Sequence, residues 1–249
     1  MDTNYVFQDL IKTVLRRGIS MTTRNHSAIS LIDAPVVEFA STPLVTLRKT
    51  AAMKAIREME WFFSGDLVCP PELRDWWSGQ LDPDNKYIGG YSQQFRRSGP
   101  FEFDQIDFVL DTLRHHPNSR RIVLSAWNPQ EMADITVLNE NPNTPTTCHN
   151  TMTQFFVRDG ALSMTTYQRS ADLLLGVPHN WVQGWAMLLF FARHAKLRVG
   201  KMRWVFGDLH IYSEKSHLLC ASDILSADPV STPDIHLEYY ADVEKPEFR

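Results

Sequence analysis

The segment 180–195 is the feature that most constrains the fold of this 249-residue chain. It reads NWVQGWAMLLFFARHA and is apolar nearly all the way round a helix, not along one stripe only. A helix of this kind has no face that favours water, so other elements must cover it. Its most apolar part, residues 185–192, is too short to cross a bilayer. The sequence therefore predicts a buried helix at the centre of a core.

The rest of the chain supplies amphipathic helices and alternating strands to surround that helix. Helical spacing of apolar residues and strand-like alternation predict the remaining elements. No repeat or long linker divides the chain, so a single domain over 1–249 is expected. The fold class predicted is α+β, with a twisted mixed sheet flanked by helices. The predicted helices cover 5–17, 51–63 and 104–115, and the predicted strands cover 121–127, 203–206 and a hairpin of 152–157 and 162–167 about Asp159-Gly160.

Charge and cysteine content exclude several classes of protein. A net charge of −4 and a pI near 6.1 argue against a nucleic-acid polymer or an acidic membrane as partner. Cys69, Cys148 and Cys220 are odd in number and widely spaced, which indicates neither a disulfide framework nor a zinc site. The first ten residues lack the pattern of a signal peptide. We therefore expect a cytoplasmic protein without a metal.

Cys148 is the candidate nucleophile. A buried structural role is the commoner fate of a cysteine, but the surrounding Thr-Thr-Cys-His-Asn is polar. The predicted hairpin places Arg169 and Ser170 across from Cys148, and an arginine near a thiol favours the reactive thiolate. On the residues alone, a cysteine hydrolase also remains open.

Arginines and an acid in an apolar helix form a second group of candidates. Arg120-Arg121, Arg169 and Arg24 are most simply solvated charges, but their fork geometry suits a phosphate monoester. Glu58 lies in an otherwise apolar helical segment, where a carboxylate is costly unless it has a partner or a task.

Eight short motifs give this chain a specific family resemblance. They occur in the order of the thymidylate synthase family and close to its spacing, between about residue 5 and about residue 217. The chain thus resembles that family, and the resemblance implies its fold and a homodimer that binds deoxyuridine monophosphate (dUMP) together with methylenetetrahydrofolate. The motifs are Pro43-Leu44-Val45-Thr46, Glu58-Met59-Glu60-Trp61-Phe62, Ser119-Arg120-Arg121-Ile122, Ser125-Ala126-Trp127-Asn128, Cys148-His149, Tyr167-Gln168-Arg169-Ser170-Ala171-Asp172, Gly176-Val177-Pro178-His179-Asn180 and Gly207-Asp208-Leu209-His210-Ile211-Tyr212.

The resemblance implies a role for each matching residue. The thiolate of Cys148 would add to C6 of uracil. Glu58 would organise transfer of the C5 proton, supported by His149 and Tyr91. Asn180 would pair with the base, and its amide favours uracil over cytosine. The resemblance also implies that the phosphate is bound by Arg24, Arg169 and Ser170, together with Arg120 and Arg121 of the partner subunit. Gln168 would contact the nucleotide, and His210 and Tyr212 would contact the sugar 3′-hydroxyl. The folate would be contacted by Asp172, Trp76 and Trp77.

Departures from the family pattern concern the product. Arg74 aligns where synthases carry a tryptophan that excludes water, although Trp76 is close enough to take that role. The tail 244–249 is charged, Arg24-Asn25-His26-Ser27 replaces a glycine-threonine loop, and His179 and Trp181 flank Asn180. These changes favour a dUMP hydroxymethylase, the kind of relative that some bacterial viruses use to make modified DNA. The alternatives are a thymidylate synthase, a dCMP hydroxymethylase and a nucleotide-binding protein without catalysis.

Overall fold

The computed structural model describes residues 2–22, 26–88, 90–129, 147–229, 236–240 and 247–248. The predicted helices are confirmed within a few residues at each end. In the described part of the chain, no helix has both the length and the apolar character needed to cross a membrane. The helices are α1 (Thr3–Arg17), α2 (Ala52–Ser64), the 3₁₀ turn η1 (Pro71–Leu73), α3 (Arg74–Trp77), α4 (Tyr91–Arg96), α5 (Gln105–His115), α7 (Val177–His194) and α8 (Lys215–Ser226).

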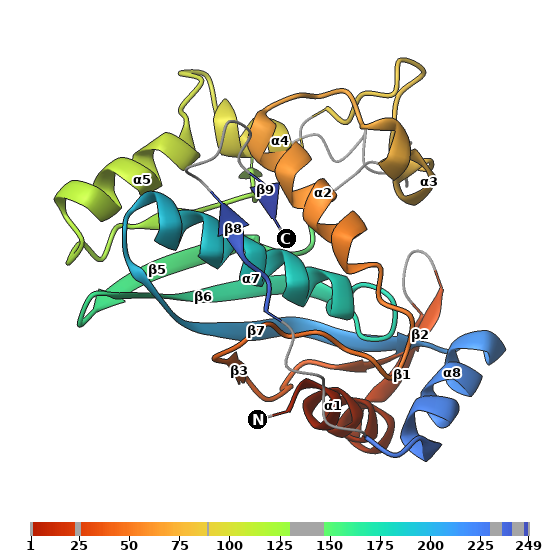
Figure 1. Ribbon diagram of the computed structural model, residues 1–249. Helices are drawn as coiled ribbons and strands as arrows, with labels where there is room; N and C mark the ends of the chain where they lie inside the picture. Colours follow the sequence, from red (N-terminus) through yellow and green to blue (C-terminus); the bar gives the residue numbers. More distant parts are fainter. Residues whose placement is uncertain are drawn as a thin grey trace.

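A mixed sheet of seven described strands organises the molecule (Figure 1). Its order is β1-β2-β7-β6-β5-β4, with β3 also paired to β7, and only β6 and β7 run parallel. The α+β expectation is thereby confirmed. The strands are β1 (Ile19–Thr22), β2 (Ser27–Leu31), β3 (Val37–Phe39), β4 (Val123–Leu124), β5 (Met152–Arg158), β6 (Ala161–Asp172) and β7 (Arg198–Tyr212), and β8 (Tyr239–Tyr240) pairs with β9 (Glu247–Phe248) in a separate ribbon.

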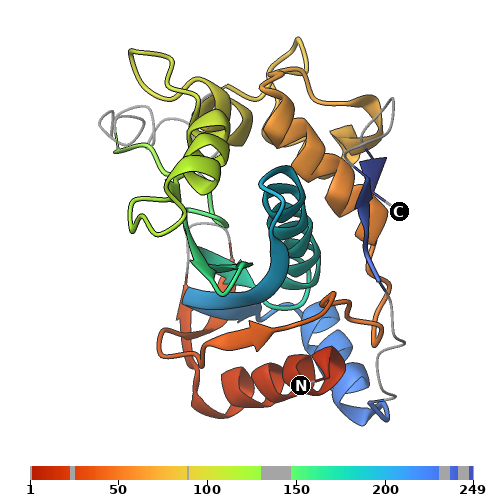
Figure 2. The same ribbon diagram turned by 60° about the vertical axis from the view of Figure 1, so that its left-hand side comes forward.

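Helix α7 is the crossover between β6 and β7 and the predicted buried helix. Parallel neighbours need a long connection, and α7 supplies it on one face of the sheet. Figures 1 and 2 show α2 packed over α7. Helix α1 packs along β2 and β7, and its Phe7 ring lies 6.3 Å from the Trp181 ring of α7. The core that results runs from Val6 on α1 to Ile224 on α8.

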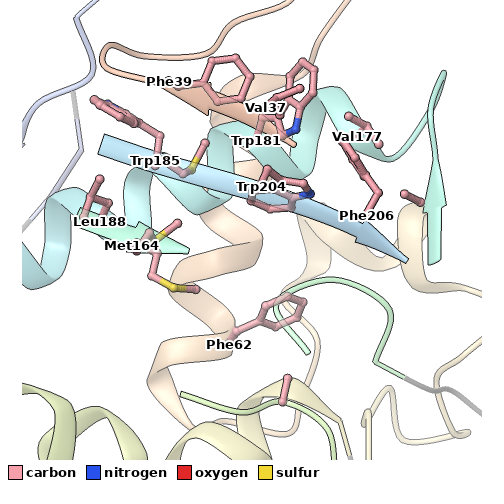
Figure 3. Close-up of a cluster of buried hydrophobic side chains, with 14 of the residues drawn as sticks. Val37, Phe39, Phe62, Met164, Val177, Trp181, Trp185, Leu188, Trp204 and Phe206 are labelled. Carbon is pink, nitrogen blue, oxygen red and sulfur yellow. The ribbon is translucent and has the colours of Figure 1, made fainter. Parts of the chain in front are cut away.

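Close packing between α7 and β7 depends on one glycine. Trp181 and Trp185 of α7 lie above Trp204 of β7 in Figure 3. A Cβ atom on Gly184 would come within 2.5 Å of the Trp204 ring and 2.9 Å of the Met202 sulfur. Only glycine therefore allows the helix to approach the sheet this closely.

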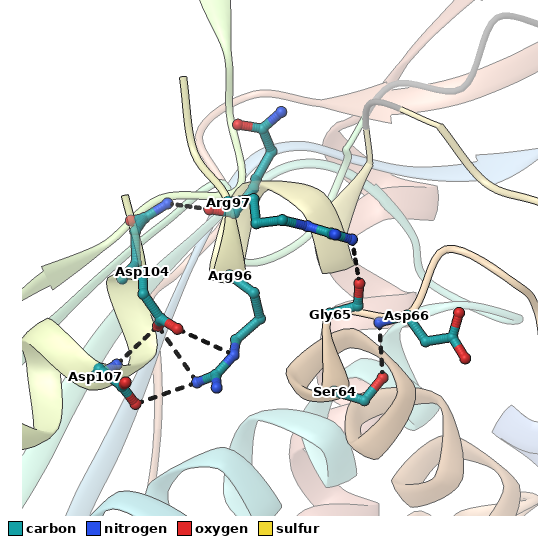
Figure 4. Close-up of polar contacts among 9 residues, drawn as sticks. Ser64, Gly65, Asp66, Arg96, Arg97, Asp104 and Asp107 are labelled. Carbon is teal, nitrogen blue, oxygen red and sulfur yellow. Dashed lines mark hydrogen bonds and ion pairs between the residues drawn. The ribbon is translucent and has the colours of Figure 1, made fainter. Parts of the chain in front are cut away.

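Helix α4, which begins at Tyr91, is held by charged contacts on two sides (Figure 4). Arg97 donates to the Gly65 carbonyl at the end of α2, at 2.6 Å. Arg96 forms an ion pair with Asp104 at the start of α5, at 3.2 Å. These contacts fix the position of Tyr91 relative to α2.

Candidate active site

Cys148 is a free, half-buried thiol that precedes β5. The hydroxyl of Tyr91 accepts hydrogen bonds from the backbone N–H of Cys148, at 2.9 Å, and of His149, at 3.3 Å. The same oxygen lies 3.0 Å from His149 Nδ1 and 3.7 Å from Cys148 Sγ. The Tyr91 hydroxyl thus positions both the thiol and the imidazole beside it.

Burial favours the protonated form of the Cys148 thiol. Burial raises the pKa of Cys148, and this effect outweighs the hydrogen bond from Tyr91 and the charge of Arg169, which both lower it. Burial also lowers the pKa of His149 to about 3, so this imidazole is neutral. Arg169 therefore acts on the pKa of the thiol in the expected direction, but burial has the larger effect.

The predicted hairpin does bring Arg169 and Ser170 to Cys148. The N–H of Ser170 donates to the Cys148 carbonyl at 3.4 Å. The Arg169 guanidinium donates to the Thr147 carbonyl at 3.3 and 3.4 Å and lies 5.3 Å from the centre of the Trp127 ring. A half-buried positive charge therefore adjoins the thiol.

Glu58 has hydrogen-bond partners that could not be predicted from the sequence. Its carboxylate accepts from the indole N–H of Trp77 on α3 and from the amide of Gln183 on α7. Burial raises the pKa of Glu58 to about 7, against these two bonds and the charge of Lys54, which lower it. Trp77 is buried with its ring 6.3 Å from that of Tyr91, so Glu58 and Cys148 are joined through one aromatic core. A carboxyl group that titrates near neutral pH is suited to moving protons.

Asn180 faces Gln168 and Gln183 at the start of α7. Gln168 donates to its Oδ1 at 3.0 Å, and its Nδ2 donates to Gln183 at 3.1 Å. Sequence reasoning missed Gln183, for which the only signal was a polar residue inside an apolar helix.

The residues expected to bind the sugar and the folate lie at the adjoining ends of β6 and β7. The strand register places His210 beside Asp172, and the His210 and Tyr212 rings are 5.1 Å apart. Asp172 accepts from the N–H groups of Leu174 and Leu175, at 3.0 Å each, and so caps the turn into α7.

Trp76 lies next to the same end of α7. Its half-buried ring is 5.0 Å from that of His179, and the Lys54 ammonium lies 4.7 Å above it. Arg74, on the same short helix, donates to the Cys69 carbonyl at 3.3 Å.

The remaining arginines are not gathered at the thiol within one chain. Arg120 and Arg121 are exposed and precede β4, whose pairing with β5 places them toward the far end of β5 from Cys148. Arg24 lies outside the described residues, as does most of the tail 244–249.

A free thiol beside a hydroxyl and an imidazole, with a buried acid nearby, provides the groups required for covalent and acid–base catalysis. The sequence model for Thymidylate synthase matches residues 5–248. A protein from Corynebacterium aurimucosum named thymidylate synthase is 35% identical over 242 residues, which cover 93% of this chain and 85% of the relative. The chain belongs to the thymidylate synthase family. Its members are enzymes that transfer one carbon from methylenetetrahydrofolate to dUMP and use no metal.

Proposed function

We propose that Cys148 bonds covalently to C6 of dUMP while one carbon is transferred to C5. The observation that carries this proposal is the Cys148 thiol held by Tyr91 in the same core as a buried acid, Glu58. Cys148 loses its S–H proton to solvent, and attack by the resulting thiolate at C6 makes C5 nucleophilic toward the folate carbon. A non-catalytic role would not require a costly buried acid next to a held thiol.

Glu58 is the group best matched to moving the C5 proton. Its pKa of about 7 lies near neutral pH, whereas that of His149, at about 3, makes the imidazole a weak base. His149 and Tyr91 act by holding the thiol and its backbone.

Arg169 and Ser170 bind the phosphate, joined by Arg24 and by Arg120 and Arg121 of a partner subunit. In support, Arg120 and Arg121 are exposed, and no hydrogen bond or ion pair links either guanidinium to another described residue. Two exposed arginines that lie toward the far end of β5 from their own Cys148 can serve a second copy in a homodimer.

The face of the sheet opposite α7 is the surface we assign to that dimer. Met152 and Tyr167 are cross-strand neighbours there, 51% and 40% exposed, and Phe156 and Val205 on the same face are half-buried. Their neighbours in sequence, such as Phe155, point toward α7. An exposed apolar strip on a sheet face suits burial against its own copy.

The nucleoside is held by Asn180 and Gln168 at the base and by His210 and Tyr212 at the sugar 3′-hydroxyl. The register between β6 and β7 places these groups at neighbouring strand ends. His210 is oriented by Asp208 at 3.3 Å, and this hydrogen bond lowers the pKa of Asp208.

Asp172 and Trp76 contact the folate, with Trp77 behind them holding Glu58. We propose that water reaches the methylene group on C5, so that the product is 5-hydroxymethyl-dUMP. Arg74, where a synthase would carry a water-excluding aromatic ring, is a polar side chain bonded to a backbone carbonyl.

The C-terminal strand supports the same product. Phe248 pairs with Tyr239, whose hydroxyl lies 3.1 Å from His194 at the far end of α7. From Asn180 to His194 the helix rises about 21 Å, at about 1.5 Å per residue. In this arrangement β9 is held through β8 near the His194 end of α7.

Thymidylate synthase activity is the second candidate. It is favoured by the name of the relative and by the Trp76 ring, which packs on His179 next to Asn180 and thereby gives the site an aromatic cover. In that case folate would deliver a hydride and the product would carry a methyl group.

Product analysis by mass spectrometry tests the proposal. The protein is incubated with methylenetetrahydrofolate and dUMP, and in parallel with dCMP. We expect dUMP to gain a hydroxymethyl group as tetrahydrofolate is released. A methyl group with dihydrofolate would establish the second candidate, conversion of dCMP alone would assign a cytosine enzyme, and no product from either nucleotide would refute catalysis.

A further inference from the structure

A continuous line of hydrogen bonds joins β7 to α2 through the candidate base-binding residue. The indole of Trp204 donates to Gln168 at 2.9 Å, and Gln168 donates to Asn180 at 3.0 Å. Asn180 donates to Gln183 at 3.1 Å, and Gln183 donates to Glu58. All five side chains are buried.

The two ends of this line fix its direction. An indole N–H only donates, so the oxygen of Gln168 must face Trp204 and its nitrogen must face Asn180. Glu58 accepts from Gln183 in the structure, and its ionised form can only accept. The nitrogen of Gln183 then faces Glu58 and its oxygen faces Asn180. Both ends thus demand the same orientation of the Asn180 amide. If the Asn180 amide were flipped, its nitrogen would face the nitrogen of Gln168 and its oxygen would face the oxygen of Gln183.

We propose that Gln183 is a positioning residue that, together with Gln168, holds Asn180 in the orientation that reads uracil and rejects cytosine. This inference rests on the proposed function. With one lone pair and one hydrogen already used, Asn180 keeps a second lone pair on Oδ1 and a second hydrogen on Nδ2. These match the N3–H donor and O4 acceptor of uracil. Cytosine presents an acceptor at N3 and a donor at C4, so both contacts would be mismatched.

The test compares binding of dUMP and dCMP to the full-length protein by calorimetry. Gln183→Met keeps much of the side-chain volume but neither fixes Asn180 nor donates to Glu58. We expect the preference for dUMP over dCMP to fall about tenfold, as for loss of a specific buried hydrogen bond. Gln8→Met is the matched control, because Gln8 is a buried glutamine on α1 that, among the described residues, bonds to the backbone carbonyls of Ile224 and Ala227 and to no side chain. It should leave the preference unchanged.

Gln168→Met provides a second variant that acts from the other end of the line. It should reduce the preference similarly, and the double variant should lose less than the product of the two single effects, because both act through Asn180. Circular dichroism and melting establish which variants fold. If unaltered protein prefers dUMP and a folded Gln183→Met or Gln168→Met variant keeps that preference, the inference is overturned while the proposed function stands. If unaltered protein does not bind dUMP, the proposed function itself fails.

Discussion

Ionisation of Glu58 should destabilise the folded protein, and Glu58→Gln should remove this effect. Burial raises the pKa of Glu58 from 4.5 to about 7. The unfolded chain therefore releases this proton more readily than the folded protein does. Stability associated with the neutral acid is present below about pH 4.5 and is lost as the pH rises through about 7.

The size of the effect follows from the two pKa values. They differ by about 2.5, and each factor of ten in proton affinity corresponds to about 1.4 kcal/mol. Glu58 thus lowers the free energy of unfolding by about 3 kcal/mol between pH 4 and pH 8. In Glu58→Gln the side chain at this position does not ionise, so it adds no pH dependence to the free energy of unfolding. Its altered contacts with Trp77 and Gln183 change that free energy by an amount that does not depend on pH.

Urea unfolding at intervals from pH 4 to pH 8 measures the difference in stability between the two proteins. As the pH rises, we expect the free energy of unfolding of Glu58→Gln to increase by about 3 kcal/mol relative to that of the unaltered protein. Glu60→Gln is the control, since Glu60 lies two residues on in α2 and pairs with Arg57 nearer the surface. A difference that stays constant with pH for Glu58→Gln would refute the reasoning that burial governs this group.

Three further outcomes are expected. Cys148→Ala should abolish turnover but leave dUMP binding measurable by calorimetry; persistent turnover would exclude the covalent scheme. Tyr91→Phe should cost about 1–3 kcal/mol in urea unfolding, because two buried N–H groups lose their acceptor, and unchanged stability would contradict the hydrogen bonds at Cys148 and His149. Gly184→Ala should lower the melting temperature and reduce the free energy of unfolding by about 1–2 kcal/mol, since overpacking against Trp204 exceeds the gain in helix propensity. A higher melting temperature would show that the side chains around Gly184 shift to make room for the added methyl group.

Elements with strong local patterns were predictable from the sequence. The all-apolar segment is α7, and the Asp159-Gly160 turn has φ of 49° and 70°, the left-handed values that a tight hairpin requires. Strands without local alternation were missed or shortened. β1 is exposed along its length, and β7 extends on both sides of the predicted 203–206.

The candidate site was predictable only in part. The hairpin was sufficient to bring Arg169 to Cys148, because its register is set by a local turn. The partners of Glu58 come from α3 and α7, and nothing local to α2 identifies them. The one sequence signal at Gln183, a polar residue in an apolar helix, does not identify its role, since that role depends on which side chains it meets after folding.

The most direct test of the account is turnover of dUMP with methylenetetrahydrofolate in water enriched in ¹⁸O. If water captures the methylene group while Cys148 holds C6, the product is 5-hydroxymethyl-dUMP with ¹⁸O in its new hydroxyl. A product that carries a methyl group and no ¹⁸O, formed together with dihydrofolate, would contradict that account.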